Sequence, residues 1–355
     1  MDMSDAVYQK LREFLDQFPI GFPRTSSGVE IEILKRLYNE EEAKIAVHLT
    51  ITPEKVSRIA RRSNLDQKYL EEKLELMSKK GLVFRTQREG NLLYNAIPFM
   101  IGLYEYSVKA MDKELASLYK KYYKTAFLDE LGSSNVPGFK VIPIEETIES
   151  GTVLLPYQML KESIMKARVI SLTECICRKE ARLTREGCNY PIETCLSFGV
   201  AAEYYIENGI GREVSAEEAI KIVEDADKAG LIHASANSKH LSNICNCCPC
   251  CCASMKGITK LGHDKHKYLN AIFESIIDEK LCIACGTCVD RCPVKAISLN
   301  DFAFVDRDLC IGCGLCAGNC SEGAITLKPR EDGEEPFNRI LEMGMAIIEG
   351  KRKQT

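Results

Sequence analysis

The sequence predicts an α+β protein made of several domains. Its 355 residues are more than one compact unit of ordinary size needs. Segments with helical periodicity alternate with short strand-like runs, which predicts a mixed architecture. The cysteines divide the chain further, because none occurs before Cys175 and all 18 follow in three groups. A hydrophobic fraction of 45% with 28% charged residues is typical of a folded globular chain.

Charge and hydropathy exclude several classes of protein. The net charge of -4 argues against nonspecific binding along nucleic acid. The longest nearly uncharged apolar stretch, residues 92–104, is shorter than the roughly 20 residues that span a bilayer. The first residues, MDMSDAVYQK, carry no basic stretch followed by an apolar core, so we expect no secretory signal, no membrane span and a cytoplasmic location. In that setting the 18 cysteines indicate metal ligands rather than disulfides.

The N-terminal region is predicted to form helices followed by a hairpin and a helical extension. Thr52 and Pro53 predict the start of one helix, and Gly81 predicts the end of the next. Two strand-like runs follow, at 82–86 and 91–95, joined by a polar turn. The segment LEEKLELMSKKGLVFRTQREGNLLYNA resembles the recognition helix and wing of a winged-helix domain.

The winged-helix resemblance implies DNA binding as one role, since such domains usually place a helix in the major groove. The charges on the candidate recognition helix cancel, however, and its carboxylates would repel phosphates. They are Asp66, Glu71, Glu72 and Glu75 against Lys68, Lys73, Lys79 and Lys80. The preceding helix has a basic face, but an ordinary solvated helix can carry the same residues. DNA binding is retained as a hypothesis, and docking to protein is favoured.

Eight cysteines near the C-terminus occur as two copies of one spacing, C-x2-C-x2-C-x3-C. The copies are Cys282, Cys285, Cys288 and Cys292, and then Cys310, Cys313, Cys316 and Cys320. Each cysteine recurs 28 residues later, which indicates an internal repeat. Three closely spaced thiolates can bind neighbouring corners of a cube-shaped cluster, and a more distant fourth thiolate can bind the remaining corner. The spacing predicts two cubane iron–sulfur clusters, with zinc knuckles as the alternative.

This region resembles the bacterial two-cluster ferredoxins, and the resemblance implies an assignment of ligands. In that pattern the fourth cysteine of each motif serves the other cluster. Cluster one would then use Cys282, Cys285, Cys288 and Cys320, and cluster two would use Cys310, Cys313, Cys316 and Cys292. One departure is visible, because Ser321 stands where the first motif has Pro293. It removes no thiolate.

Ten further cysteines lie in the middle of the chain. Six of them fall within the eight residues of CNCCPCCC and cannot all face one small ion. The candidate ligands of a third iron–sulfur centre are Cys175, Cys177, Cys188, Cys195, Cys245, Cys247 and Cys248. Redox-active dithiols are an alternative, and so are structural zinc or buried thiols. Arg178 is expected either to lower nearby thiolate pKa values or to form a surface salt bridge, and His233 is expected to be structural.

The segment from Val153 to Cys252, which includes ECICRKEARLTREGCNYPIETCLSFG, resembles a domain found upstream of ferredoxin modules in bacterial and archaeal iron–sulfur proteins. The resemblance implies an association with iron–sulfur chemistry and no particular reaction.

Four regions follow from these observations. They are residues 1–130, winged-helix-like with a helical extension; 139–262, mixed and cysteine-rich; 273–330, a ferredoxin domain with two [4Fe-4S] clusters; and 331–355, a helical tail.

The predicted function is electron transfer to or from a partner oxidoreductase. The alternatives are a redox enzyme in the middle domain that the ferredoxin domain feeds, and a redox-sensing DNA-binding regulator. An electron carrier or oxidoreductase component is favoured over a stand-alone enzyme. The sequence defines neither the partner nor the oligomeric state.

Overall fold

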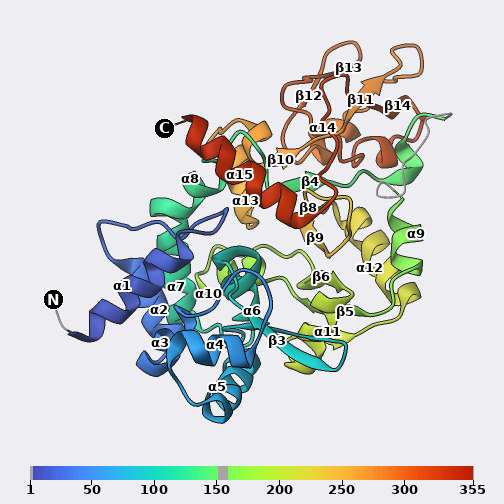
Figure 1. The fold of residues 1–355 in the computed structure, drawn as a ribbon. Coiled ribbons are helices and arrows are strands. Elements are labelled where there is room, and N and C mark those ends of the chain that lie inside the picture. The colour runs from blue at the N-terminus through green and yellow to red at the C-terminus, as the bar shows by residue number, and fades with distance from the viewer. Residues whose placement is uncertain (1–2, 151–158, 355) are drawn as a thin grey trace.

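The fold is known from a computed structural model that describes residues 3–150 and 159–354. Helices and strands are mixed along the chain, consistent with an α+β class. In Figure 1, N-terminal helices lie to one side of a central sheet, and the segment with β11–β14 lies on the other. Residues 153–158, which begin the predicted cysteine-rich segment, lie outside the described residues. Over the described ranges, no helix is both long and apolar enough to cross a bilayer.

The N-terminal region combines five helices with a small sheet. Its elements are α1 (Met3–Leu15), α2 (Val29–Leu37), α3 (Glu40–Ala46), β1 (Glu54–Lys55), α4 (Val56–Ser63), α5 (Gln67–Lys79), β2 (Phe84–Arg88) and β3 (Asn91–Asn95). β3 pairs antiparallel with both β1 and β2. The expected hairpin is present, with its first strand two residues later than predicted. The helix expected to begin at Pro53 begins at Val56, because the two residues of β1 pair with β3 instead.

An aromatic helical segment connects this region to the sheet. It consists of η1 (Phe99–Leu103), α6 (Tyr104–Tyr106), α7 (Lys113–Tyr122), η2 (Tyr123–Phe127) and α8 (Leu128–Leu131). Phe99 lies at its centre, with its ring 4.8 Å from that of Phe127 and 5.4 Å from that of Tyr122. The buried Tyr104 hydroxyl donates to Glu180 of the next region at 2.7 Å. The aromatic side chains therefore serve packing between regions.

The middle of the chain forms a seven-stranded sheet in the order β10-β4-β8-β9-β6-β5-β7. Its strands are β4 (Phe139–Val141), β5 (Ile170–Glu174), β6 (Glu193–Phe198), β7 (Arg212–Glu213), β8 (Ile232–Ala236), β9 (Asn243–Cys247) and β10 (Leu269–Asn270). All neighbours are antiparallel except β10 and β4, which are parallel. The sheet thus takes its last strand from beyond the predicted boundary at residue 262.

Helices cover both faces of this sheet. They are α9 (Leu160–Met165), α10 (Ile176–Leu183), α11 (Val200–Glu207), α12 (Ala216–Ala229) and α13 (Ala253–Thr259). Leu196 and Ile244 pack with α9 and α12 in one core. Because side chains alternate along a strand, Cys195 and Cys245 are directed to the opposite face, where α10 and α13 lie.

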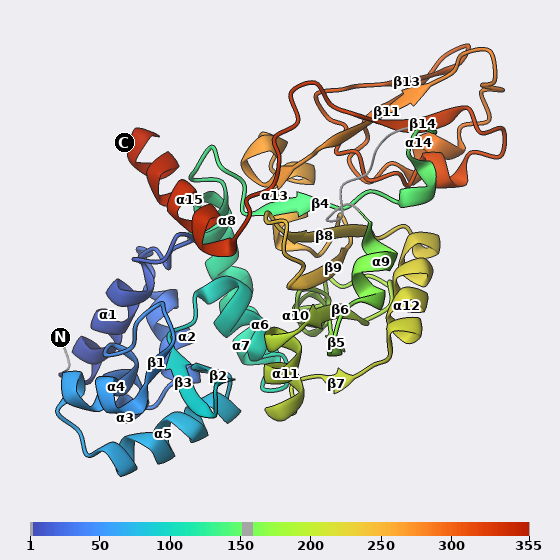
Figure 2. The same cartoon turned by 45° about the vertical axis from the view of Figure 1, so that its right-hand side comes forward.

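The C-terminal elements form a separate module and a final helix. They are β11 (Phe273–Ile277), α14 (Thr287–Arg291), β12 (Ile297–Leu299), β13 (Ala303–Val305), η6 (Ala317–Asn319), β14 (Ile325–Pro329) and α15 (Ile340–Gln354). β11 pairs with β14, and β12 pairs with β13. Figure 2 shows this module projecting beyond the edge of the central sheet that carries β4 and β8. The tail helix α15 returns to the body, where Met343 and Ile347 are buried and Lys351 pairs with Glu130.

The N-terminal hairpin rests on α11 of the middle region. The buried Tyr204 hydroxyl donates to the carbonyl oxygens of Ser78 (3.1 Å) and Val83 (2.9 Å). The Phe84 ring stacks on that of Tyr204, with centroids 4.7 Å apart. Arg85 pairs with Glu207 on the same helix. The end of α5 and the start of β2 are therefore held by the sheet domain.

Removal of the Tyr204 hydroxyl should loosen this interface. Tyr204→Phe removes one buried donor from the interface, while the Ser78 carbonyl still accepts from Gly81 N–H, so we expect a loss of about 1 kcal/mol of stability. The measurement is the urea concentration at the midpoint of unfolding, monitored by circular dichroism under anaerobic conditions. Tyr69→Phe is the matched control, because Tyr69 donates to Glu41 at an exposed site and should change stability by less than about 0.5 kcal/mol. Equal midpoints for the two variants would contradict the interface described above.

Candidate metal centres

Four cysteines of the C-terminal module meet around one small cavity. Cys282, Cys285 and Cys288 line it together with Cys320, which comes from the second motif. Cys285 is exposed and Cys288 is buried. The fold therefore brings the fourth cysteine of the second copy to the first three of the first copy.

The other four cysteines form a more buried group. Cys310, Cys313 and Cys316 are all buried, and the charges of Cys310 and Cys292 both act on Cys316. The Ser275 hydroxyl lies 3.2 Å from the sulfur of Cys316 and 3.9 Å from that of Cys310. Burial raises the pKa of Cys316 to about 12, so a metal must displace these protons when it binds.

The sequence repeat is carried into the backbone. Three positions in each copy have positive φ angles, and they correspond at the 28-residue interval: Ala284 and Gly312 (55° and 65°), Gly286 and Gly314 (81° and 83°), and Lys295 and Gly323 (56° and 62°). Amide groups also repeat, since Ala296 N–H donates to the Cys292 sulfur at 3.1 Å and Ala324 N–H donates to the Cys320 sulfur at 3.3 Å. Such hydrogen bonds stabilise thiolate ligands and tune cluster potential.

The two groups differ in what surrounds them. Around the first, Ile283 is 63% exposed and Leu281 is 49% exposed. Around the second, the Cys313 carbonyl accepts from Ile144 N–H at 3.3 Å, and the Cys310 carbonyl accepts from Lys265 Nζ at 2.6 Å. One group faces outward and the other is anchored to the sheet domain.

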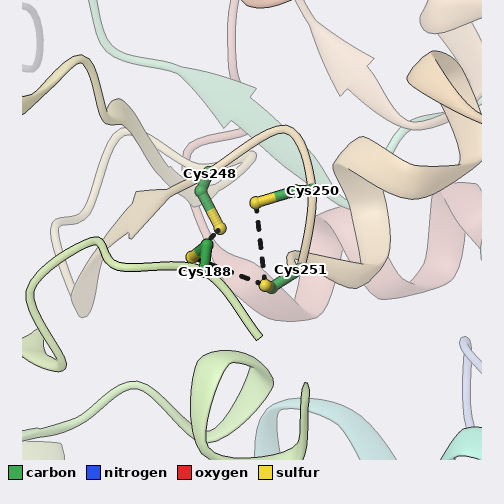
Figure 3. A group of neighbouring side chains, drawn as sticks. All are labelled: Cys188, Cys248, Cys250 and Cys251. Carbon is green, nitrogen blue, oxygen red and sulfur yellow. Dashed lines mark hydrogen bonds between the residues drawn. The ribbon is translucent and has the colours of Figure 1, made fainter. Parts of the chain in front are cut away.

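A third group of thiols lies in the sheet domain. Cys188, Cys248, Cys250 and Cys251 come from the loop after α10 and from the turn after β9, and their sulfurs all lie within 4.8 Å of one another. Figure 3 shows the four side chains directed toward one another. The sulfur distances are 3.9 Å for Cys188–Cys248, 3.6 Å for Cys188–Cys251 and 3.7 Å for Cys250–Cys251.

These distances fit one tetrahedral ion. Metal–sulfur bonds of about 2.3 Å place the four sulfurs of such an ion about 3.8 Å apart. The ligands of a cubane bind separate iron atoms, so a cubane needs a larger space between its ligands than one ion does. Zinc or a single iron ion therefore suits this group. The hydrogen bond from Cys251 lowers the pKa of Cys248 to about 4, and the same contact raises the pKa of Cys251.

A fourth group surrounds a cavity of about 80 Å³ on the α10 face of the sheet. Seven cysteines line this cavity, and the six that do not belong to the tetrahedral group form the fourth group: Cys175, Cys177, Cys195, Cys245, Cys247 and Cys252. The seven candidate ligands of a third centre are thus divided, because Cys188 and Cys248 belong to the tetrahedral group and the other five line this cavity. Sequence reasoning considered Cys250, Cys251 and Cys252 as redox-active thiols and did not include them among the metal ligands, although their place in CNCCPCCC was an available signal.

The two polar residues singled out near these thiols are both buried. Both ring nitrogens of His233 have partners at 2.5 Å, Asn246 and Asp227, so this side chain is occupied by structural hydrogen bonds. Arg178 is fully buried and donates to the Asn246 carbonyl at 2.9 Å. The expected surface salt bridge of Arg178 is wrong, because the guanidinium lies inside the domain beside the thiols of Cys175 and Cys195.

Comparison with known proteins places the C-terminal module in a defined class. Residues 275–298 and 303–326 each match the family described as the 4Fe-4S binding domain. The two tandem matches support two [4Fe-4S] clusters, and the separate cysteine group supports an additional centre. No curated protein and no solved structure matches the chain.

Gly312 is expected to be essential for the inner cluster. A Cβ atom at this position would lie 2.0 Å from the Phe273 carbonyl oxygen, and φ is +65°. Gly312→Ala should therefore displace the loop and remove about four iron and four sulfide per chain. The control is Gly323→Ala, which has the same backbone conformation with no atom near the added methyl group. It should cost about 1 kcal/mol and keep all clusters. A full iron content in Gly312→Ala would contradict the expected clash.

The tetrahedral group is expected to bind one metal atom without sulfide. Cys250→Ser should lower zinc or iron by about one atom per chain and leave acid-labile sulfide unchanged, because a four-thiolate ion has no inorganic sulfide. Mass spectrometry of metals and a sulfide assay provide the readouts. Asn189→Ala, an exposed change in the same loop as Cys188, is the control and should change neither. Parallel loss of iron and sulfide in Cys250→Ser would show that the group holds a cluster instead.

Proposed function

We propose that this chain is an iron–sulfur electron-transfer protein that connects an external redox protein with its own cysteine-rich domain. The observation that carries this proposal is the unequal environment of the two ferredoxin-type cysteine groups. Three of the four cysteines of the inner group are buried, against one of four in the outer group. The inner group is also hydrogen-bonded to the sheet domain.

The ligand sets proposed for the two clusters are the crossed ones. The cavity shared by Cys282, Cys285, Cys288 and Cys320 supports the first set. The mutual electrostatic effects of Cys292, Cys310 and Cys316 support the second, with Cys313 in the same loop. A bound [4Fe-4S] cluster supplies a one-electron couple, and its potential depends on the N–H groups and burial that the chain provides.

The outer face suits a transient protein partner. Ile283, Leu281 and Leu299 are exposed around the outer cysteine group, and Phe304 is 40% exposed on the neighbouring strand. Exposed apolar side chains near a redox centre let a partner exclude water and approach closely. One electron at a time would enter here and leave through the inner group, or pass in the reverse direction.

The N-terminal region is proposed to support this assembly rather than to bind DNA. The end of its candidate recognition helix and the start of its wing are already in contact with α11, through Tyr204 and Glu207. Lys73 and Lys80 pair with Glu41 and Glu42, which reduces the charge available to phosphates.

An acidic residue on the outer face should slow electron exchange with a protein. Ile283→Glu places a charge on the proposed docking surface, so the second-order rate constant for reduction by flavodoxin hydroquinone should fall several-fold. Stopped-flow absorbance of the anaerobic protein measures this rate. Iron and sulfide contents should remain at the wild-type level, because the side chain is not a ligand.

Leu76→Glu is the matched control for that experiment. Leu76 is 53% exposed on α5, far along the chain from the ferredoxin module, and its replacement should leave the rate unchanged. Equal rates for both variants would place the docking surface elsewhere. EPR of the reduced protein shows whether the clusters accept an electron. If neither cluster does, the electron-transfer function itself is overturned.

A further inference from the structure

The six thiols of the sheet-domain cavity come from four separate segments. Cys175 precedes α10 as its N-cap, and Cys177 lies in the first turn. Cys195 lies on β6, and Cys245 and Cys247 lie two residues apart on β9, so that the latter two share a face. Cys252 caps α13. All six converge on one cavity of about 80 Å³.

Their sulfurs form a continuous series around that cavity. The Cys252 and Cys247 sulfurs lie 3.3 Å apart. The Cys175 thiol interacts with those of Cys177 and Cys195, and the Cys177 thiol also interacts with that of Cys252. The Cys247 thiol also interacts with that of Cys245, which is the last member of the series. A single tetrahedral ion needs four donors and little space, whereas the cavity of about 80 Å³ has room for several atoms, because roughly 10–15 Å³ accommodates one water molecule.

Arg178 places a buried positive charge beside thiols of both groups, Cys175 and Cys195 of this site and Cys248 of the tetrahedral group. Its side chain is fully buried, and no carboxylate in the described part of the chain pairs with it. Nη1 donates to the Asn246 carbonyl and Nη2 contacts the Thr194 hydroxyl, but Nε has no partner among the described residues. A buried cation needs anionic neighbours, and metal-bound thiolates supply them, since metal binding deprotonates the sulfurs.

The other walls of the cavity are mostly apolar. Ile176, Ile232, Ala234 and Met255 line it and are buried, and Glu105 contributes a carboxyl group. An apolar shell with a few N–H donors is the environment in which thiolate-bound iron–sulfur centres are protected from water. The tetrahedral group lies next to this cavity, with Cys248 also lining it, and it holds only the four thiols that one ion needs.

We propose that Cys175, Cys177, Cys195, Cys245, Cys247 and Cys252 form the binding site of an iron–sulfur cluster, distinct from the four-thiolate site beside it. The cluster would use four of these six thiolates, and Arg178 would offset part of their charge. The redox role of this cluster rests on the proposed electron-transfer function. In that role the cluster would be the internal redox partner of the inner ferredoxin cluster.

A short hydrogen-bonded route joins the two sites. Ile144 N–H donates to the Cys313 carbonyl, and Ile142 N–H donates to the His233 carbonyl at 2.9 Å. His233 on β8 is the register partner of Asn246, which lies between Cys245 and Cys247 on β9. Two strand spacings correspond to about 10 Å. One electron passing along this route would oxidise one site and reduce the other by one electron, without a proton or a further reactant.

The experiment is a sulfide count on matched triple variants. Two ferredoxin-type clusters contribute about eight sulfides per chain, and the four-thiolate ion contributes none. We expect more than eight in the wild-type protein purified without oxygen. The variant C177S/C195S/C247S leaves three of the six thiols assigned to the cluster, fewer than a cluster needs, so it should lose the excess sulfide and one EPR component. The control variant C188S/C250S/C251S removes as many thiols from the same domain and should keep both.

The outcomes separate this inference from the proposed function. A wild-type count of about eight that the cavity variant does not change overturns the cluster and leaves the ferredoxin function intact. Loss of the excess sulfide in the control variant instead would also overturn the assignment. If the excess is lost only in the cavity variant while no reduced ferredoxin-type signal forms in the wild type, the cavity cluster stands and the electron-transfer function fails. The wild-type count does not depend on the folding of any variant.

Discussion

The pairing of β4 in the central sheet is the constraint on which the arrangement of the regions depends. This three-residue strand follows the aromatic helical segment directly and is held between β8 and β10. The residues after it contact the ferredoxin module, where Ile144 meets Cys313 and Glu149 N–H donates to the Leu327 carbonyl at 2.8 Å. A short buried strand is thus hydrogen-bonded on both sides and joins three regions at once. Because β4 is paired with a strand on each side, movement of one region would cost hydrogen bonds in the others.

The cysteine groups lie in different surroundings. The outer ferredoxin group is accessible at Cys285, the inner one is covered by the sheet domain, and the cavity group lies on one face of the sheet, where half of its six cysteines are buried. Burial and hydrogen bonding change the potential of iron–sulfur centres. Identical thiolate chemistry can therefore give different potentials in different surroundings, and the fold provides three such surroundings within one chain.

Sequence spacing predicted the ferredoxin motifs because their ligands are local. Three ligands of each centre, such as Cys282, Cys285 and Cys288, lie within seven residues of one another, and the repeat of the motif is visible in the sequence. The middle domain could not be resolved in the same way, because its groups depend on strand register and on where β9 ends. Cys245 and Cys247 share a face within the strand, while Cys248 follows its last residue and turns toward Cys188. The start of α4 was missed for a related reason, since pairing with β3 prevailed over the local preference of Pro53.

The exposure of Cys285 has a consequence for damage by oxidants. Thiolates and iron at an accessible edge meet oxygen and peroxide before those behind a protein wall, and oxidation of an accessible cysteine can proceed to irreversible acids. Brief contact with air should thus attack the outer ferredoxin centre first. Such a molecule would keep its buried metal centres and part of its colour but would have lost the cluster that exchanges electrons with a partner. Partially bleached protein would therefore still contain metal while being unable to exchange electrons with other proteins.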